Sequence, residues 1–102
     1  MNAGNPQVSE RAATPHGTLR YWAAAREAAG TAQEPYAAST LAEALRGAVA
    51  AHGGEGGALA AVLRRCAFVI DGAPAGKRDP AAVELVEGGT VEVLPPFAGG
   101  AA

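Results

Sequence analysis

The sequence contains a single cysteine, few aromatic residues and no long apolar run. One cysteine cannot pair within its own chain, so Cys66 excludes an internal disulfide. No segment reaches the roughly 20 consecutive apolar residues of a membrane-spanning helix, so we expect no membrane-embedded segment. Aromatic residues are 5% of the 102 residues, and much of the 49% apolar content is alanine, which buries little area. The core must therefore come from the Leu and Val residues together with Tyr21, Trp22, Phe68 and Ile70.

The sequence also lacks an excess of positive charge. Eight Lys and Arg residues stand against ten Asp and Glu residues, which gives a formal net charge of −2 at pH 7. Nucleic-acid binding needs concentrated positive charge, and the pairs Arg64–Arg65 and Lys77–Arg78 do not form a basic stripe. We therefore expect no nucleic-acid partner. The two pairs are interpreted as solvated surface or, alternatively, as part of a docking face.

Patterns typical of catalytic and metal sites are missing as well. His16 and His52 lie far apart in the sequence, and no Ser, His and Asp set has an informative spacing. The glycine-rich residues 53–57 lack the Lys and Ser or Thr of a phosphate-binding loop. Cys66 has no His or acidic residue nearby in sequence, which favours a buried structural thiol. The sequence predicts no metal site, no bound cofactor and no self-contained enzyme.

The N-terminal residues 1–17 show neither helical nor strand periodicity. They contain one large aliphatic residue, Val8, so we expect a disordered extension, with a contact role for a partner as the alternative. They lack the charged-then-apolar order of a signal peptide, and a cytoplasmic location is expected. The length indicates one domain. We place it at residues 18–94, followed by a flexible tail at 95–102.

Within the expected domain, strand and helix patterns alternate. Period-two alternation predicts a first strand at 18–23, with Trp22 on the face opposite Tyr21, either covered by a neighbouring segment or exposed as a contact residue. Pro35 restricts a second strand to the edge of the sheet. The remaining predicted strands are at 33–37, 66–70 (buried), 73–76 (cut short by Pro74) and 90–94. Helical pieces are predicted at 23–29, at 40–52 and at 58–65, with a turn or short helix around 80–82.

Two local motifs strengthen this assignment. Thr40 and Glu43 have the spacing of a capping box, and apolar residues then recur at three- and four-residue steps from Leu41 to Val49. This helix is expected to end near His52, interpreted as a solvent-facing residue that interacts with the helix dipole. Asp71–Gly72 is a typical two-residue hairpin turn. A mixed sheet over the main helix buries that apolar stripe, so we predict an α+β roll of the β-grasp kind.

The last strand runs directly into a tail that cannot continue it. Pro95 and Pro96 have no N–H group and fix φ, so the chain must leave the sheet in an extended form. Gly99 and Gly100 then provide backbone without side chains. Residues 95–100 can reach about 20 Å. Such a narrow end suits a carboxylate that enters the active-site channel of another protein, although a frayed terminus is the alternative.

Two stretches of the sequence, RYWAAAREAAG and GGTVEVLPPFAGG, resemble the MoaD/ThiS family of ubiquitin-like sulfur carriers. The resemblance covers residues 18–100 and includes the FVIDG hairpin and the Glu87–Gly88–Gly89 turn. Within the family, the similarity is closest to the small subunit of molybdopterin synthase. The resemblance implies the same β-grasp fold.

The resemblance also implies a chemistry and a set of partners. An E1-like adenylyltransferase of the MoeB/ThiF type would use ATP to adenylate the carboxylate of Gly100. A sulfur donor with a Cys persulfide would then convert it to a thiocarboxylate, and a molybdopterin synthase large subunit of the MoaE type would receive it. Gly99 and Ala98 would thread through the channel. The residues that would dock onto the partner are Phe97, Pro96 and Leu94, although Phe97 could instead fold back onto its own domain.

Ala101 and Ala102 depart from the family pattern, in which Gly–Gly is usually the end. They add roughly 7 Å and move the carboxylate away from Gly100. A trimming protease that exposes Gly100 is the favoured explanation. A non-carrier adaptor or modifier, or an artefact at the end of the gene, stays open. So does a carrier that serves thiamine, cysteine or a sulfur-containing natural product.

Overall fold

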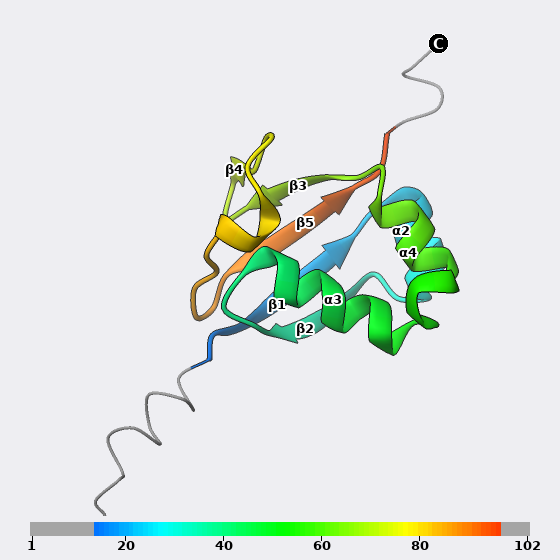
Figure 1. Ribbon diagram of the computed structural model, residues 1–102, viewed down its shortest axis with the longest axis horizontal. Coiled ribbons are helices and arrows are strands. Elements are labelled where there is room, and N and C mark those ends of the chain that lie inside the picture. Colours follow the sequence, from blue (N-terminus) through cyan, green and yellow to red (C-terminus); the bar gives the residue numbers. More distant parts are fainter. Residues whose placement is uncertain (1–13, 97–102) are drawn as a thin grey trace, which may run out of the picture.

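A mixed five-stranded sheet carries the longest helix on one face (Figure 1). The computed structural model describes residues 14–96, and Phe97 to Ala102 and residues 1–13 lie outside the described part. The strands are β1 His16–Tyr21, β2 Gln33–Ala37, β3 Ala67–Ile70, β4 Ala73–Pro74 and β5 Thr90–Leu94. The helices are α2 Ala23–Ala29, α3 Leu41–Ala51 and α4 Ala58–Leu63, with 3₁₀ turns at Gly54–Gly56 and Pro80–Ala82.

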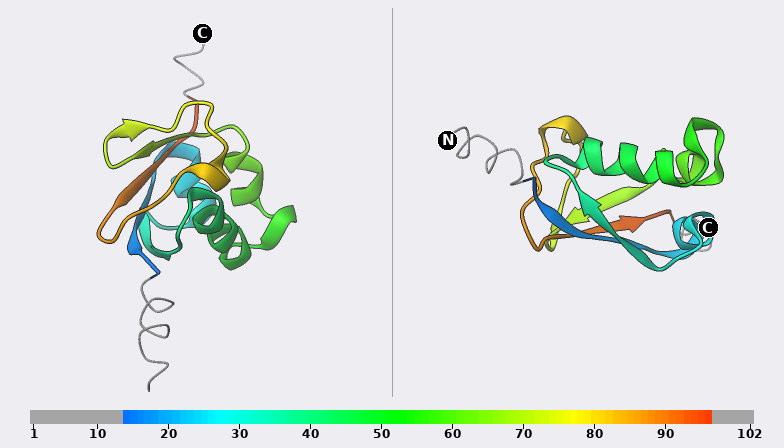
Figure 2. Two further views of the ribbon diagram at one scale, coloured as in Figure 1. Left: turned by 60° about the vertical axis from the view of Figure 1, so that its left-hand side comes forward. Right: turned by 90° about the horizontal axis from the view of Figure 1, so that it is seen from below.

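The strand order is β2-β1-β5-β3-β4, with β1 and β5 parallel and the other pairs antiparallel. The last strand in sequence therefore lies at the centre of the sheet, and β2 is an edge strand as Pro35 predicted. Helix α3 covers one face of the sheet, while α2 and α4 pack together at one end (Figure 2). The α+β roll expected from the order of the elements is thus present.

The core lies between the sheet and α3. Leu19 and Tyr21 of β1 are in register with Val91 and Val93 of β5, and all four side chains point to the helical side and are buried. Large residues alone do not fill this layer. Small side chains complete it, since seven alanines are also buried: Ala25, Ala29, Ala38, Ala44, Ala48, Ala60 and Ala75.

The start of α3 confirms the predicted capping box. The Thr40 hydroxyl accepts a hydrogen bond from the Glu43 backbone N–H at 3.2 Å. The Glu43 carboxylate reaches back to the backbone N–H of Ser39 at 2.9 Å, one residue before the cap. These contacts satisfy two backbone donors that the helix itself cannot pair.

The hairpin turn is also confirmed. Asp71 and Gly72 have φ angles of 51° and 86°, as a type I′ turn requires. The Asp71 carboxylate accepts from the backbone N–H of Thr90 at 2.8 Å and so ties the turn to the start of β5. The returning strand β4 is only two residues long and ends at Pro74, as expected.

The first strand begins two residues earlier in the sequence than predicted. β1 begins at His16, inside the expected disordered extension of residues 1–17. The distant turn at 87–89 pairs with it: the Gly88 N–H donates to the His16 carbonyl at 2.7 Å, and the Thr18 N–H to the Gly89 carbonyl at 3.0 Å. This pairing is invisible in the local pattern of residues 14–17. The prediction for residues 1–13 concerns residues outside the described part.

Three further expectations needed correction. Trp22 does not join the core, because β1 ends at Tyr21 and the indole is 40% exposed. The strand expected at 66–70 begins at Ala67, and only Ile70 in it is fully buried, since its alternate side chains lie on the uncovered face. Helix α4 ends at Leu63 rather than at residue 65.

Within residues 14–96, no helix is both long and apolar enough to cross a bilayer.

Candidate functional site

The chain leaves the body at the end of the central strand β5. Leu94 pairs with Ala67 of β3 and lies half-buried on the uncovered face of the sheet. Pro95 is buried, whereas Pro96 is exposed. The predicted tail at 95–102 stays a prediction, because only its first two residues are described. The predicted roles of Phe97, Ala98, Gly99 and Gly100 stay predictions, since these residues lie outside the described part.

The end of β5 is fixed on both sides, so that the exit point has a defined position. The Trp22 backbone N–H donates to the Val93 carbonyl at 3.2 Å, and β3 holds the other edge through the Ala67–Leu94 pair. Neither proline can donate a hydrogen bond, so the ladder stops there. β1 starts at the opposite end of the sheet from the exit (Figure 1).

Beside the exit, the uncovered face carries a polar and aromatic cluster. The Trp22 indole N–H donates to the Glu92 carboxylate at 3.1 Å, and the Arg20 guanidinium lies 5.2 Å from the centre of the indole ring. Arg20 and Glu92 are neighbours in the parallel ladder. Glu92 and Leu94 share a face because strand side chains alternate. Sequence reasoning named Trp22 and Leu94 but missed the two charged residues, which only the strand register brings together.

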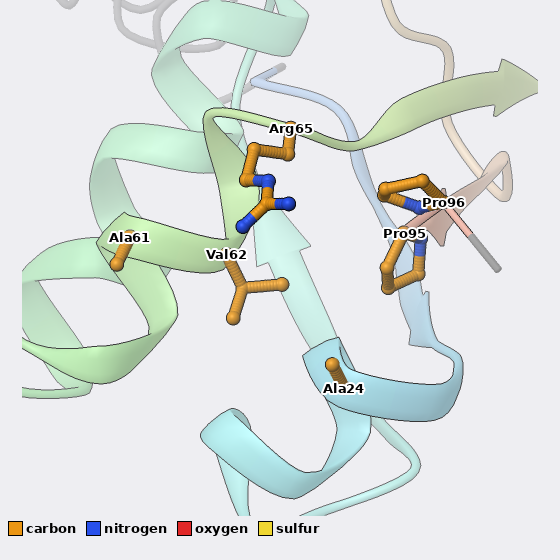
Figure 3. A pocket seen from close by; sticks show the side chains of 6 residues that line it. All are labelled: Ala24, Ala61, Val62, Arg65, Pro95 and Pro96. Atoms are coloured by element: carbon orange, nitrogen blue, oxygen red, sulfur yellow. The ribbon is translucent and has the colours of Figure 1, made fainter. Parts of the chain in front are cut away.

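A groove of about 280 Å³ lies on the other side of the exit, between α2 and α4 (Figure 3). Its apolar walls include Ala24, Val62 and Pro95, and Arg65, which follows α4, also lines it, with its guanidinium turned toward Val62. Of the basic pair predicted at 64–65, Arg65 thus borders the exit of the tail. No local sequence pattern indicates the groove, because its walls come from three distant segments.

A second, partly buried polar cluster joins β1, β2 and the end of α3. The Tyr21 hydroxyl donates to the Glu34 carboxylate at 2.5 Å, and the His52 Nε2 lies 2.9 Å from the same carboxylate. His52 was expected to face solvent, but it turns inward from the end of α3 to pair with Glu34. Burial, with the adjacent Glu34 carboxylate, raises the pKa of Tyr21 far above its usual value, so the phenol stays a donor.

Cys66 is half-buried rather than buried, and its thiol donates to the Val62 carbonyl at 3.3 Å. Burial raises the pKa of this thiol to about 11. Because the thiolate is the reactive form, the thiol is unreactive at neutral pH, in line with a structural role. Within residues 14–96, no group of three or more His, Cys, Asp and Glu side chains is arranged to hold a metal ion.

The family of the chain follows from a comparison with family models. The model of the ThiS family matches residues 19–100, which is most of the sequence and includes the proline pair and the two glycines. The chain belongs to the ThiS family. The resemblance found in the sequence is thereby confirmed. The matched range ends at Gly100 and leaves Ala101 and Ala102 outside.

Solved structures support the ubiquitin-like β-grasp fold of this ThiS-family chain. The small archaeal modifier protein 1 of Methanosarcina acetivorans has a TM-score of 0.70 at 18% identity, covering 82% of this chain and 95% of that one. The HVO 2177 protein of Haloferax volcanii has a TM-score of 0.68 at 26% identity, with 85% and 88% covered. A putative molybdopterin converting factor, subunit 1, from Pyrococcus furiosus has a TM-score of 0.61 at 16% identity, with 81% and 99% covered. No curated protein matches the sequence.

Family membership sets a general expectation for how this site works. Small proteins of the ThiS and MoaD type are generally carriers rather than enzymes. They generally associate with E1-like activating enzymes and with synthase subunits.

Proposed function

We propose that this protein is a sulfur carrier for molybdopterin biosynthesis and that Gly100 carries the sulfur as a thiocarboxylate. One observation carries the proposal: in a ThiS-family chain, the central strand ends in two prolines directly before Phe–Ala–Gly–Gly. The body fixes where the tail starts, and the remaining residues are slim enough to enter a partner's active site.

The chemistry explains why such a tail needs partners. A carboxylate is a poor electrophile, so an E1-like adenylyltransferase of the MoeB/ThiF type would join the Gly100 carboxylate to AMP from ATP and release pyrophosphate. The terminal sulfur of a donor's Cys persulfide then forms a bond to the carbonyl carbon as AMP leaves. A thiol must next cleave the S–S bond and become oxidised to a disulfide, which releases the thiocarboxylate. ATP is thus a substrate of the activating enzyme and is not held by this chain.

Docking onto a partner would involve the residues around the point where the tail leaves the sheet. Leu94 and Pro96 lie at the surface where a large subunit of the MoaE type would cover them, and Phe97 follows directly. Gly99 and Ala98 would then pass the narrow part of the partner's channel. No side chain larger than a methyl group follows Phe97 in this sequence, which suits that passage.

Activation at Gly100 requires that the residues after it be removed. The family match ends at Gly100, which supports a trimming protease that cleaves before Ala101. Without cleavage, the carboxylate would lie roughly 7 Å too far along the tail.

A second candidate uses the same acyl-adenylate differently. Solved structures with this fold include small archaeal modifier proteins, so Gly100 of this chain could be joined to lysine side chains of other proteins as a modifier. A sulfur carrier for thiamine, cysteine or a natural product would share every step except the final acceptor. The acceptor therefore distinguishes the candidates.

Intact-mass spectrometry of the protein from its native host tests the proposal. We expect a species that lacks Ala101 and Ala102 and in which one oxygen is replaced by sulfur. Lysine-linked adducts without any sulfur-containing form would support the modifier instead. Retention of both alanines in all of the protein, in a host that makes molybdopterin, would refute the carrier.

Purified components give the matched control. A chain that ends at Gly100 should release pyrophosphate with the adenylyltransferase and ATP, whereas the 102-residue chain should not. Gly100→Val in the shortened chain should abolish activation. Gly47→Ala, on an open surface of α3, should leave activation unchanged, since nothing lies within 4 Å of a side chain added there.

A further inference from the structure

The groove at the tail exit has an apolar interior with one cation at its border. Val62, Ala24 and the ring of Pro95 supply apolar walls, and Arg65 contributes the charge. Within residues 14–96, the Arg65 side chain has no carboxylate partner and donates no hydrogen bond. Figure 3 shows its guanidinium turned toward Val62 on one side of the gap, with the rings of Pro95 and Pro96 on the other side.

This combination suits an aromatic ring. Apolar walls favour a large apolar side chain because burial removes its surface from water. A guanidinium within about 6 Å of a ring centre is attracted to the ring face, and arginine is the residue most often found in such pairs. An aliphatic side chain would pack against the apolar walls but would not be attracted to the Arg65 guanidinium. A carboxylate would be attracted to the guanidinium but would not pack favourably against the apolar walls.

The sequence offers one aromatic residue for this place. Residues 1–13 contain none, and the structure assigns positions to four others: Tyr21, Trp22, Tyr36 and Phe68. Phe97 is the fifth, and it directly follows Pro96, which itself borders the groove. With no intervening residues, the effective concentration of the ring at the groove is very high. Pro95 and Pro96 also limit the backbone freedom lost on docking.

We infer that Phe97 docks into the groove between α2 and α4 in the free protein, with its ring beneath Arg65. In the free protein, docking buries the Phe97 ring. A partner that binds the same ring must therefore compete with the groove for it. The docking itself is independent of sulfur chemistry, whereas its role as a store for the partner-binding residue rests on the proposed function.

The direct test is NMR spectroscopy of the free 102-residue protein. We expect nuclear Overhauser contacts between the Phe97 ring and the Val62 methyl groups. The ring should also shift these methyl resonances upfield, and Phe97→Leu should remove the shift. The backbone order parameter at residue 97 should approach the value of about 0.85 that is typical of a rigid backbone.

Adjacent arginines provide the control. Arg65→Glu should weaken the contacts and lower the order parameter at residue 97 toward about 0.6, the range of flexible segments. Arg64→Glu makes the same charge change one residue away, but Arg64 borders a different hollow, between α3 and α4, and should change nothing. Both residues are exposed, so neither substitution threatens folding.

The inference is wrong if the wild-type protein shows no contact between Phe97 and Val62 and an order parameter below about 0.6 at residue 97. It is also wrong if the Val62 methyl groups become shielded only after the adenylyltransferase is added, since the groove would then belong to the partner. Neither result depends on whether Gly100 can be activated. A failure of the docking and a failure of the carrier function are therefore separable.

Discussion

At the scale of single residues, Gly17 leaves the least room for a side chain among the described glycines. A side chain on this residue of β1 would overlap the Gly89 carbonyl oxygen and the phenol ring of Tyr36. The ring cannot easily withdraw, because the Tyr36 hydroxyl donates to the Val86 carbonyl at 2.9 Å. Gly17→Ala should therefore lower the free energy of unfolding by about 1–3 kcal/mol, as overpacking does. Urea denaturation of the variant and the wild type measures this difference.

The matched control is Gly47→Ala, the same substitution on the exposed side of α3. Nothing lies within 4 Å of the added methyl group, and alanine is the better helix former. We expect a gain of about 0.5–1 kcal/mol in the free energy of unfolding. If both substitutions change stability in the same direction and by the same amount, the crowding at Gly17 is not real.

At the scale of elements, the start of α3 is held by its cap and by the segment that precedes β5. Leu41 donates its backbone N–H to the Val83 carbonyl at 2.9 Å, next to the Thr40 cap. Thr40→Ala removes the acceptor of the Glu43 amide and should lower the free energy of unfolding by about 1 kcal/mol. Hydrogen exchange should become faster at that amide. Thr40→Ser keeps the hydroxyl and should restore both values; unchanged exchange in Thr40→Ala would show that the cap is not formed.

Elements with a local cause could be predicted from the sequence. The capping pair and the apolar stripe predicted α3, Asp71–Gly72 predicted the hairpin, and two prolines predicted where β5 ends. Contacts between distant segments could not be predicted in this way. The start of β1 depends on a turn about seventy residues later, and the inward turn of His52 depends on Glu34 across the core.

The same distinction between local patterns and contacts of distant segments applies to the candidate site. Leu94 and Pro96 could be placed at the exit because Leu94 ends a strand with clear alternation and Pro96 follows two residues later. The groove beside them could not, since Val62 and Pro95 meet only when α4 packs near the end of the central strand. The environment of Trp22 likewise depends on a strand register that has no local signature.

At the scale of the whole molecule, one partly buried carboxylate joins the sheet to the end of the longest helix. Glu34 of β2 accepts from the Tyr21 hydroxyl of β1 and pairs with His52 at the end of α3. Glu34→Ala leaves the buried Tyr21 hydroxyl without its acceptor, at a cost of about 1–3 kcal/mol. Tyr21→Phe in addition removes the unpaired donor, so the double variant should lose less stability than the two single losses combined.

A double-mutant cycle by urea denaturation measures this coupling, which we expect between about 0.5 and 3 kcal/mol for residues in direct contact. The control cycle pairs Tyr21→Phe with Glu27→Ala, an exposed carboxylate on α2 that forms no hydrogen bond or ion pair within residues 14–96. Its effects should add within about 0.5 kcal/mol. Equal coupling in both cycles would mean that Glu34 does not link the sheet to α3, and that apolar packing alone holds the two layers together.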